Sequence, residues 1–287
     1  MGRLSEPPFH RIAIVGVGLI GGSIALAVKR RWPAADVTGI DRPPVLETAR
    51  QLAVIDRGSE GLEGVESAEL VILAAPVLQN AAALQELPRI LRRAVITDVG
   101  STKRTILEAA RVLPPELPFV GGHPLSGAAA GGVEAARPDL FTDRPWLLTR
   151  SASTTDAVLD SLAEFVTGLG AIPRVIGATE HDRLLAFLSH LPQLTVTALM
   201  HVVGDQVGAD GLALAGRGLH DTTRLASSPA SPWRDIVASN GDNVTVAIDA
   251  LIAALEELKS AAKPEGTPAL DRMFLSAARW KGVLEHW

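Results

Sequence analysis

Short apolar runs alternate with helical patterns over the first 177 residues of this 287-residue chain. The runs, rich in aliphatic residues, predict strands at residues 11–15, 36–40, 70–74, 94–97, 117–120, 145–149 and 173–176. Apolar positions at helical spacing predict helices between them, at residues 24–31, 78–90, 101–111 and 154–168. This regular alternation predicts an α/β fold with a doubly wound sheet.

The pattern changes after Gly177, where long helical stretches replace the strands. Residues 178–203, 243–263 and 267–287 carry apolar stripes at helical spacing, and Pro192 should kink the first of these helices. We therefore predict a sheet domain at residues 1–177 and an all-helical domain at residues 178–287. The stripes, with Trp280 and Trp287 near the end, exceed what one small helical domain can bury, so we expect a homodimer formed through this half.

Residues 184–203 form the most apolar long stretch, but His190, Pro192 and Gln193 interrupt it. These interruptions favour a buried helix of a soluble protein over a membrane span. The first residues of the chain show no apolar targeting segment. We expect a cytoplasmic protein without a membrane partner.

Charge and composition narrow the chemistry that the chain can perform. It has 27 basic and 32 acidic residues, a formal charge of −5, and no basic run that could follow a phosphate backbone, which argues against a nucleic-acid partner. It contains no cysteine, so disulfides, thiolate catalysis and thiolate metal sites are excluded, and we expect no metal site. Catalysis must use histidine, serine, arginine or carboxylates.

A glycine-rich loop, Gly16-Val-Gly18-Leu19-Ile20-Gly21, follows the first predicted strand and opens a helix. In this context one glycine makes the tight turn, the next lets a pyrophosphate reach the helix N-terminus, and the third lets helix and strand pack closely. The second predicted strand ends in Asp41, where this pattern has a carboxylate for the ribose hydroxyls. The loop and Asp41 together predict a Rossmann-type dinucleotide site.

The residues that follow the predicted strands indicate which cofactor binds and where it lies. Asp41 favours NAD over NADP because its charge would repel a 2′-phosphate, whereas Arg42 could stack on adenine, accommodate that phosphate or be a solvated residue before a turn. Ala75-Pro76 and Gly100 follow the third and fourth strands, at the carboxyl ends where ligands lie, and we assign them to the cofactor site. Ser101 could cap a helix or aim its hydroxyl into the cleft.

His123 lies in the run Gly121-Gly122-His123-Pro124-Leu125-Ser126-Gly127, directly after the strand predicted at residues 117–120. The glycines let the backbone approach a ligand closely, and Pro124 restricts the backbone of the histidine. The same residues would suit a structural histidine in a tight turn. The other signatures along the chain favour a catalytic imidazole.

The helical half offers further polar candidates. His190 could face a pocket at the Pro192 kink or be a satisfied core histidine. Residues 216–224 are glycine-rich, with polar residues that no helix face calls for, so we expect a functional loop. Within it, Arg224 could be a surface cation or could bind a substrate carboxylate.

Taken in order, these signatures resemble the prephenate/arogenate dehydrogenase family, the cyclohexadienyl dehydrogenases of tyrosine biosynthesis. The resemblance rests on the glycine loop, Asp98-Val-Gly-Ser101-Thr-Lys103, the His123 run, Ser189-His190-Leu-Pro192, and Asp221-Thr-Thr-Arg224 followed by Trp233-Arg-Asp235. It implies an NAD-dependent oxidative decarboxylase, in which a histidine accepts the proton of the ring C4 hydroxyl while hydride passes to NAD and the ring carboxylate leaves as CO2. His123 matches that histidine, Ser101 the serine that holds it in register, and Arg224 the arginine that binds a substrate carboxylate.

The resemblance also places His190, Gln193, Ser126 and Asp221 around the substrate. Two positions depart from the family pattern, because Ala128-Ala129 replaces a polar Thr-Glu pair and Gln193 replaces a second histidine. Both lie where the substrate's side chain should sit, so the choice between prephenate, arogenate and 4-amino-4-deoxyprephenate stays open. Two rivals remain: an NAD-binding sensor without catalysis, and a β-hydroxyacid-type dehydrogenase, which usually uses a lysine on the interdomain helix that residues 178–203 lack.

Overall fold

The structure is a computed structural model that describes residues 6–127, 130–263 and 267–285 and divides into two compact units, residues 1–240 and 241–287. The strands are β1 (Arg11–Val15), β2 (Asp36–Ile40), β3 (Arg57–Ser59), β4 (Leu70–Leu73), β5 (Val95–Asp98), β6 (Phe119–Pro124), β7 (Pro145–Arg150) and β8 (Ile172–Val175). The α-helices are α1 (Leu19–Arg31), α2 (Pro43–Gln51), α3 (Val77–Ile90), α4 (Arg104–Ala109), α5 (Asp156–Gly168), α6 (Ala178–Leu185), α7 (Leu191–Leu212), α8 (Arg217–Thr222), α9 (Ala230–Ala261) and α10 (Thr267–Glu285).

The eight strands form one sheet in the order β3-β2-β1-β4-β5-β6-β7-β8. The β6–β7 pair is antiparallel and all the other pairs are parallel. The chain therefore winds outward from β1 in both directions, which confirms the predicted doubly wound sheet. The three-residue strand β3 was not predicted from the sequence, because a strand this short has too few positions to show a pattern.

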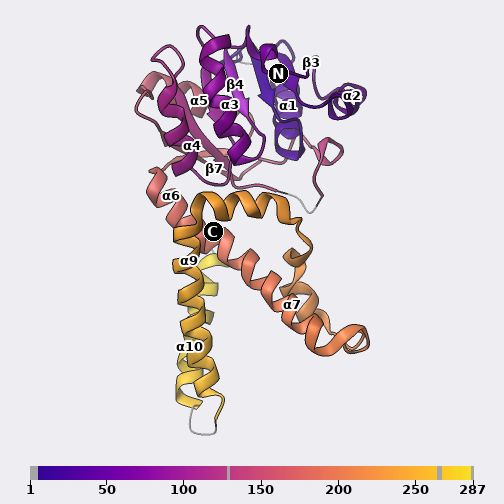
Figure 1. Ribbon diagram of the computed structural model, residues 1–287, viewed down its shortest axis with the longest axis vertical. Coiled ribbons are helices and arrows are strands. Elements are labelled where there is room, and N and C mark those ends of the chain that lie inside the picture. The colour runs from indigo at the N-terminus through magenta and orange to yellow at the C-terminus, as the bar shows by residue number, and fades with distance from the viewer. Residues whose placement is uncertain (1–5, 128–129, 264–266, 286–287) are drawn as a thin grey trace. The chain divides into compact units, whose positions relative to one another are not determined.

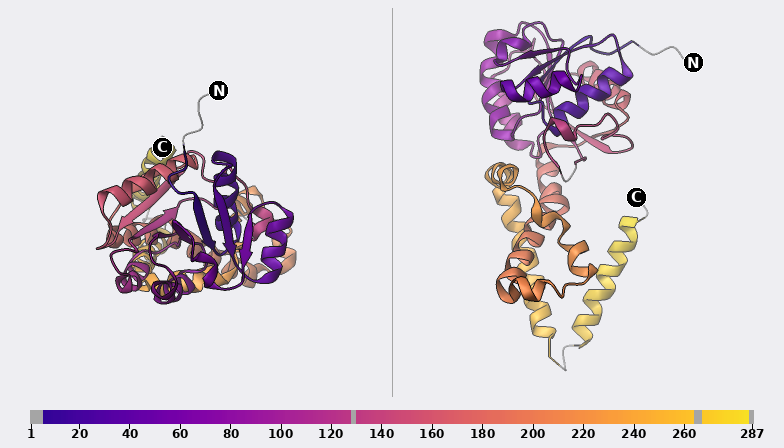
Figure 2. Two further views of the ribbon diagram at one scale, coloured as in Figure 1. Left: turned by 90° about the horizontal axis from the view of Figure 1, so that it is seen from above. Right: turned by 90° about the vertical axis from the view of Figure 1, so that its right-hand side faces the viewer.

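Helices cover both faces of the sheet (Figures 1 and 2). Side chains alternate between the faces of a strand, so Ile12 and Ile14 of β1 lie in one core with α1 and α5, whereas Ala13 lies in the other with α3 and α4. Strands buried on both sides read as continuous apolar runs, and this is why the sequence located most of them well.

The stretch predicted as one kinked, buried helix at residues 178–203 is α6, a π-helical turn (Ala186–His190) and α7. Pro192 lies in the first turn of α7, directly after the π-helical turn. The expected burial of this stretch is wrong for α7, in which Gln193 is the buried residue and the other residues are half-buried or exposed among the described residues. By length and composition alone, the helical stretch Ala178–Leu212 could cross a membrane.

The glycine-rich segment at residues 216–224 is helical, which corrects the loop expected from its composition. It forms α8 and then a 3₁₀ turn (Arg224–Ser227). Its polar side chains are compatible with a helix because they are solvated or bond within the segment: the hydroxyls of Thr222 and Thr223 donate to the carbonyls of Gly218 and Leu219, one turn earlier.

Helix α9 is interrupted at Asn240, whose backbone is not helical (φ −139°, ψ 25°). Its first part packs on the edge of the sheet, where Ser239 Oγ lies 2.8 Å from Thr102 Oγ1 and Arg104 donates to Asn240 Oδ1 at 3.0 Å. The first compact unit therefore extends well beyond Gly177, and the domain boundary between residues 177 and 178 stays a prediction.

The second unit contains the rest of α9 and all of α10 (Figure 2). Several of its large apolar side chains are exposed in the single chain: Ile252, Leu255, Phe274, Leu275, Trp280 and Leu284. Trp287, which the sequence analysis counted among the apolar stripes, lies outside the described residues.

Candidate active site

Three glycines at the junction of β1 and α1, namely Gly16, Gly18 and Gly21, each have a separate structural role. Gly16 has φ +96°, and a Cβ there would lie 2.7 Å from backbone atoms of Ala74 and Ala75. A Cβ on Gly21 would lie 2.0 Å from the carbonyl oxygen of Gly16. A Cβ on Gly18 would have nothing within 4 Å among the described residues, so the N-terminus of α1 is open to a phosphate at that point.

Asp41, directly after β2, stabilises this loop by hydrogen bonds. Its carboxylate accepts the N–H of Val17 at 2.8 Å and that of Arg42 at 2.7 Å, while the Arg42 side chain is 84% exposed. A cleft of about 870 Å³ opens beside them, and its lining includes Gly16, Gly18, Asp41, Arg42, Ala75 and Pro76. The residues predicted for the adenosine end of a dinucleotide thus share one cleft.

A second cleft continues along the same edge of the sheet. Ala74, Ala75 and Pro76 line both clefts, so the two are adjacent. The lining of the second cleft also includes Ile20, Gly100, Ser101, Asp235 and Ile236. The predicted residues Ile20, Gly100 and Ser101 therefore lie together, and the first part of α9 covers them. Leu19, also assigned to the cofactor site, is the first residue of α1 and does not line either cleft.

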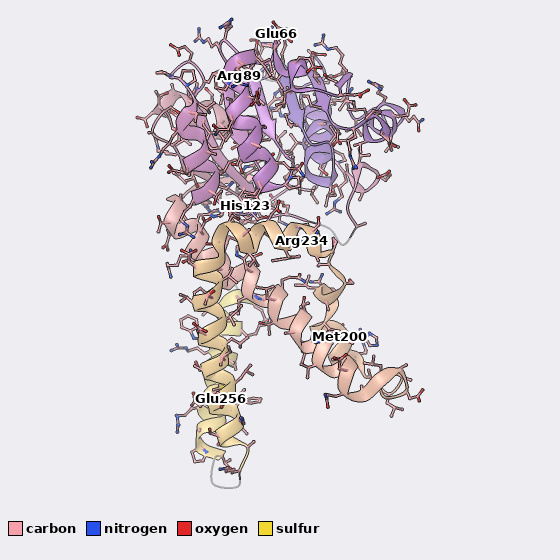
Figure 3. All side chains as sticks on the ribbon, viewed as in Figure 1. Glu66, Arg89, His123, Met200, Arg234 and Glu256 are labelled. Carbon is pink, nitrogen blue, oxygen red and sulfur yellow. The ribbon has the colours of Figure 1, made fainter. Side chains whose placement is uncertain are left out.

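His123 lies within β6, opposite Leu147 of β7, and not after the strand as the sequence predicted. Figure 3 shows it at the edge of the sheet that faces the first part of α9, which carries Arg234. The strand can pass this point because residue 122 is a glycine: a Cβ there would lie 2.4 Å from the Asp98 carbonyl oxygen. Gly122 thus lets β6 run close against β5.

A chain of hydrogen bonds runs from His123 into the interior. Its Nδ1 lies 2.9 Å from Nε2 of His181, and Nδ1 of His181 lies 2.8 Å from a carboxylate oxygen of Asp182. His181 and Asp182 both belong to α6 and are fully buried. The geometry resembles that of a catalytic triad, in which a carboxylate orients an imidazole.

Asp182 is the charged end of this chain of hydrogen bonds, which we call the relay. The backbone N–H groups of Lys103 and Arg104 donate to its two oxygens at 2.7 and 2.9 Å. Burial raises the pKa of Asp182, but the hydrogen bonds from His181, Arg104 and Lys103 lower it more, so the pKa lies below its ordinary value. The carboxylate is therefore ionised at neutral pH.

The ionised carboxylate dictates the positions of the protons. Asp182 can only accept, so Nδ1 of His181 carries a proton and its Nε2 accepts one from Nδ1 of His123. Nε2 of His123 is then an acceptor, and no hydrogen bond among the described residues occupies it. Burial lowers the pKa of His123 well below its ordinary value, and the nearby His181, Lys103 and His190 lower it further, so this imidazole is neutral.

A buried ion pair lies beneath the histidine strand. Lys103 Nζ donates to an Asp98 oxygen at 2.5 Å, and neither side chain is exposed. The Asp98 carboxylate also accepts the N–H groups of Gly100 and Gly122 at 2.8 and 3.0 Å. Burial lowers the pKa of Lys103, although Asp98 opposes the shift. The pair joins the cofactor cleft to the strand that carries His123.

Four buried side-chain polar atoms have no hydrogen-bond partner among the described residues, and two of them belong to predicted substrate residues: Oγ of Ser126 and Nε2 of His190. The other two are Nε1 of Trp32 and Oγ1 of Thr149. His190 closes the π-helical turn, its ring meets Trp233 edge to face, and its Nδ1 lies 3.4 Å from Nδ2 of Asn240. Burial lowers the pKa of His190 to about 4, so it is neutral. Such unsatisfied groups suit a polar ligand.

The remaining predicted residues do not belong to the relay that the described residues form around His123. Asp221 and Arg224 are exposed, and no hydrogen bond among the described residues joins either of them to His123. Gln193 is buried, and its amide bonds to groups of this chain. Ala128 and Ala129 lie outside the described residues.

The sequence reasoning missed His181 and Asp182, and it took Lys103 only as part of a motif. The run Thr179-Glu180-His181-Asp182 has a sufficient local explanation as a helix start with acidic first-turn residues. A usable signal was present, since a histidine and an aspartate in succession at a domain junction can supply an orienting pair for another histidine.

Comparison with known proteins agrees with this geometry. Residues 24–175 match the sequence model described as the prephenate dehydrogenase nucleotide-binding domain, and residues 177–276 match that of the prephenate dehydrogenase dimerization domain. The chain is 35% identical to the prephenate dehydrogenase of Bacillus subtilis (strain 168) over 280 residues, which cover 95% of this chain and 76% of that protein.

Two solved structures are similar over almost their whole length. The prephenate dehydrogenase of Aquifex aeolicus in complex with hydroxyphenyl propionate and NAD+ has a TM-score of 0.85 and 29% identity, covering 94% of this chain and 98% of that one. The arogenate dehydrogenase of Synechocystis has a TM-score of 0.80 and 26% identity, covering 96% and 99%. This chain therefore belongs to the prephenate dehydrogenase family and is a dehydrogenase.

Proposed function

We propose that the protein catalyses the NAD-dependent oxidative decarboxylation of a cyclohexadienyl acid, prephenate or arogenate, in tyrosine biosynthesis. The observation that carries the proposal is the free Nε2 of a neutral His123, oriented by His181 and Asp182 at the sheet edge where the nucleotide clefts open. When the carbon that bears a hydroxyl group loses hydride, the proton of that hydroxyl needs such an acceptor.

The residues present fit a dinucleotide. Gly16 and Gly21 allow the tight loop, Gly18 leaves room for the pyrophosphate, and Asp41 places a negative charge in the adenosine cleft. When bound there, NAD supplies the acceptor for the hydride that leaves C4 of the substrate ring. The Asp41 charge supports NAD over NADP, and we expect kcat/KM to favour NAD by about tenfold or more in parallel assays.

His123 performs the proton transfer in this proposal. Its Nε2 takes the proton of the C4 hydroxyl as the C–H bond breaks, and the resulting positive charge is stabilised through His181 by Asp182. The C4 oxygen becomes a carbonyl, which draws electrons from the ring when the carboxylate leaves as CO2. The ring becomes aromatic, and the oxygen takes its proton back from His123, so the residue ends as it began.

Five further side chains complete the proposed site. Ser101 lines the second cleft, where its hydroxyl can hold the C4 oxygen in register with His123. Ser126 and His190 offer the unsatisfied Oγ and Nε2 to polar groups of the substrate. Arg224 binds a substrate carboxylate, with Asp221 on the helix just before it.

We also propose a homodimer formed through residues 178–287. The match to a dimerization domain and the exposed apolar side chains of α10 support it. The cytoplasmic location stays a prediction.

The proposal is tested by mixing the protein with NAD and, in turn, prephenate, arogenate and 4-amino-4-deoxyprephenate, and recording absorbance of the reduced cofactor. Turnover of prephenate or arogenate, with release of CO2, is the expected result. Turnover of the amino analogue alone would move the protein to a different substrate. NAD binding without turnover of any of the three would identify a sensor and contradict the proposal.

A further inference from the structure

Gln193 is the buried residue of α7, and its side chain is 4% exposed. Its Nε2 donates to the carbonyl oxygen of Leu225 at 2.8 Å and to Thr197 Oγ1 at 3.2 Å. Its Oε1 accepts the hydroxyl of Ser228 at 3.2 Å. Both ends of the amide are thus used by groups of the protein itself.

Two of these partners belong to the segment that begins at Arg224 and ends at Ser228. Leu225 and Ser228 lie within and directly after the 3₁₀ turn Arg224–Ser227, more than thirty residues from Gln193 along the chain. A 3₁₀ turn of four residues has little stability of its own, because its hydrogen bonds are few and poorly aligned. The Arg224 side chain is exposed, so the hold on its backbone determines where the guanidinium can reach.

We propose that Gln193 is a positioning residue, which fixes the Arg224–Ser228 segment and acts on the substrate through Arg224 without touching the substrate's side chain. The proposal rests on the function proposed above, in which Arg224 binds a carboxylate. It assigns to Gln193 a role different from the direct substrate contact expected from its place in the sequence.

The chemistry of the substrates makes this role testable. Prephenate and arogenate share their carboxylates and differ in the side chain, which carries a keto group in one and an ammonium group in the other. A residue that acts through Arg224 affects both substrates by the same factor. A residue that contacts the side chain discriminates between them, because only one of the two side chains carries a cation.

The test uses Gln193→Met, which keeps the length of the side chain and removes its hydrogen bonds. Thr197→Val is the matched control, since it removes one partner of the amide and leaves both contacts with the segment. Backbone hydrogen exchange of residues 225–228 should become on the order of tenfold faster in Gln193→Met, as expected for the loss of two hydrogen bonds, and should be unchanged in Thr197→Val. Unchanged exchange in Gln193→Met would overturn the proposal.

Steady-state kinetics supply a second readout that loss of packing alone would not give. In Gln193→Met, KM should rise by the same factor, about five to tenfold, for prephenate and arogenate, with kcat little changed. Adding Gln193→Met to Arg224→Ala should raise KM no further, because the first residue acts through the second. A rise for one substrate only, or additive effects of the two substitutions, would show direct contact and overturn the proposal.

Failure of the role proposed for Gln193 can be distinguished from failure of the role proposed for Arg224. If Arg224→Ala leaves KM unchanged, the role of Arg224 in the proposed function is wrong. The exchange measurement does not depend on substrate and still decides whether Gln193 holds the segment.

Discussion

The sheet edge around His123 and the helical half that follows it are built in opposite ways. Around His123 the supporting groups are fully buried and paired: Asp98 with Lys103, and Asp182 with His181 and two backbone N–H groups. In the helical half, by contrast, large apolar side chains such as Leu188, Leu214 and Leu275 are 71, 87 and 72% exposed, and Arg224 is exposed as well. One chain thus holds the His123 imidazole in place by itself, whereas its exposed helical surfaces are those that the proposed dimer would cover.

The largest effect should come from removing the proton acceptor. His123→Asn should lower kcat by about two to four orders of magnitude, the usual value of a positioned general base, with NAD affinity little changed. Initial rates and a direct titration with NAD check both parts. Equal turnover in the variant would show that His123 is not the proton acceptor. The buried groups around it would then have no role in proton transfer.

Disrupting the relay behind His123 should have the next largest effect. In Asp182→Asn the neutral amide no longer stabilises the charge that His123 acquires, so we expect kcat to fall by about a hundredfold. Circular dichroism should show an unchanged fold. A variant that folds normally and retains full activity would mean that His181 and Asp182 only pack against His123.

The buried His190 should make stability depend on pH. Its pKa is about 4 when folded, below the ordinary value of 6.5, so the unfolded state binds more protons between these values and stability falls as the pH drops through this window. The effect is about 3 kcal/mol in the free energy of unfolding. Urea unfolding at pH 7.5 and pH 4 should therefore show a smaller difference between the two pH values in His190→Gln than in the unmodified protein. The same pH dependence in both would contradict the assignment.

The smallest effect on catalysis is expected from a substitution in the exposed apolar surface of α10. Leu275→Glu in α10 should halve the mass measured by light scattering, because a buried charge is not tolerated in an apolar interface. Asp160→Lys on α5, an exposed charge change on the sheet domain, is the control and should leave the mass unchanged. A monomer before any substitution would show that these helices are not a dimer interface.

The sequence predicted best the features that depend on neighbouring residues. Gly16, Gly18, Gly21 and Asp41 could be assigned because consecutive strands of a parallel sheet bring their carboxyl ends to one edge. His123 stood out for a similar reason, although its position within β6 depends on contacts with β5 that no local pattern shows.

Features that depend on distant partners were missed. His181 lies 58 residues from His123, and its helix start has an adequate local explanation, so nothing in the sequence joined the two. The helicity of α8 was hidden because its glycines and polar residues are typical of a loop. The burial of Gln193 against a segment more than thirty residues away had no local signal either.

The most direct test is the ¹⁵N NMR spectrum of the His123 imidazole in the free protein, assigned with His123→Asn and followed from pH 8 to pH 4. We predict a neutral ring with its proton on Nδ1 and a free Nε2, with a pKa well below 6.5. An ordinary pKa near 6.5, or a proton resident on Nε2, would contradict the account.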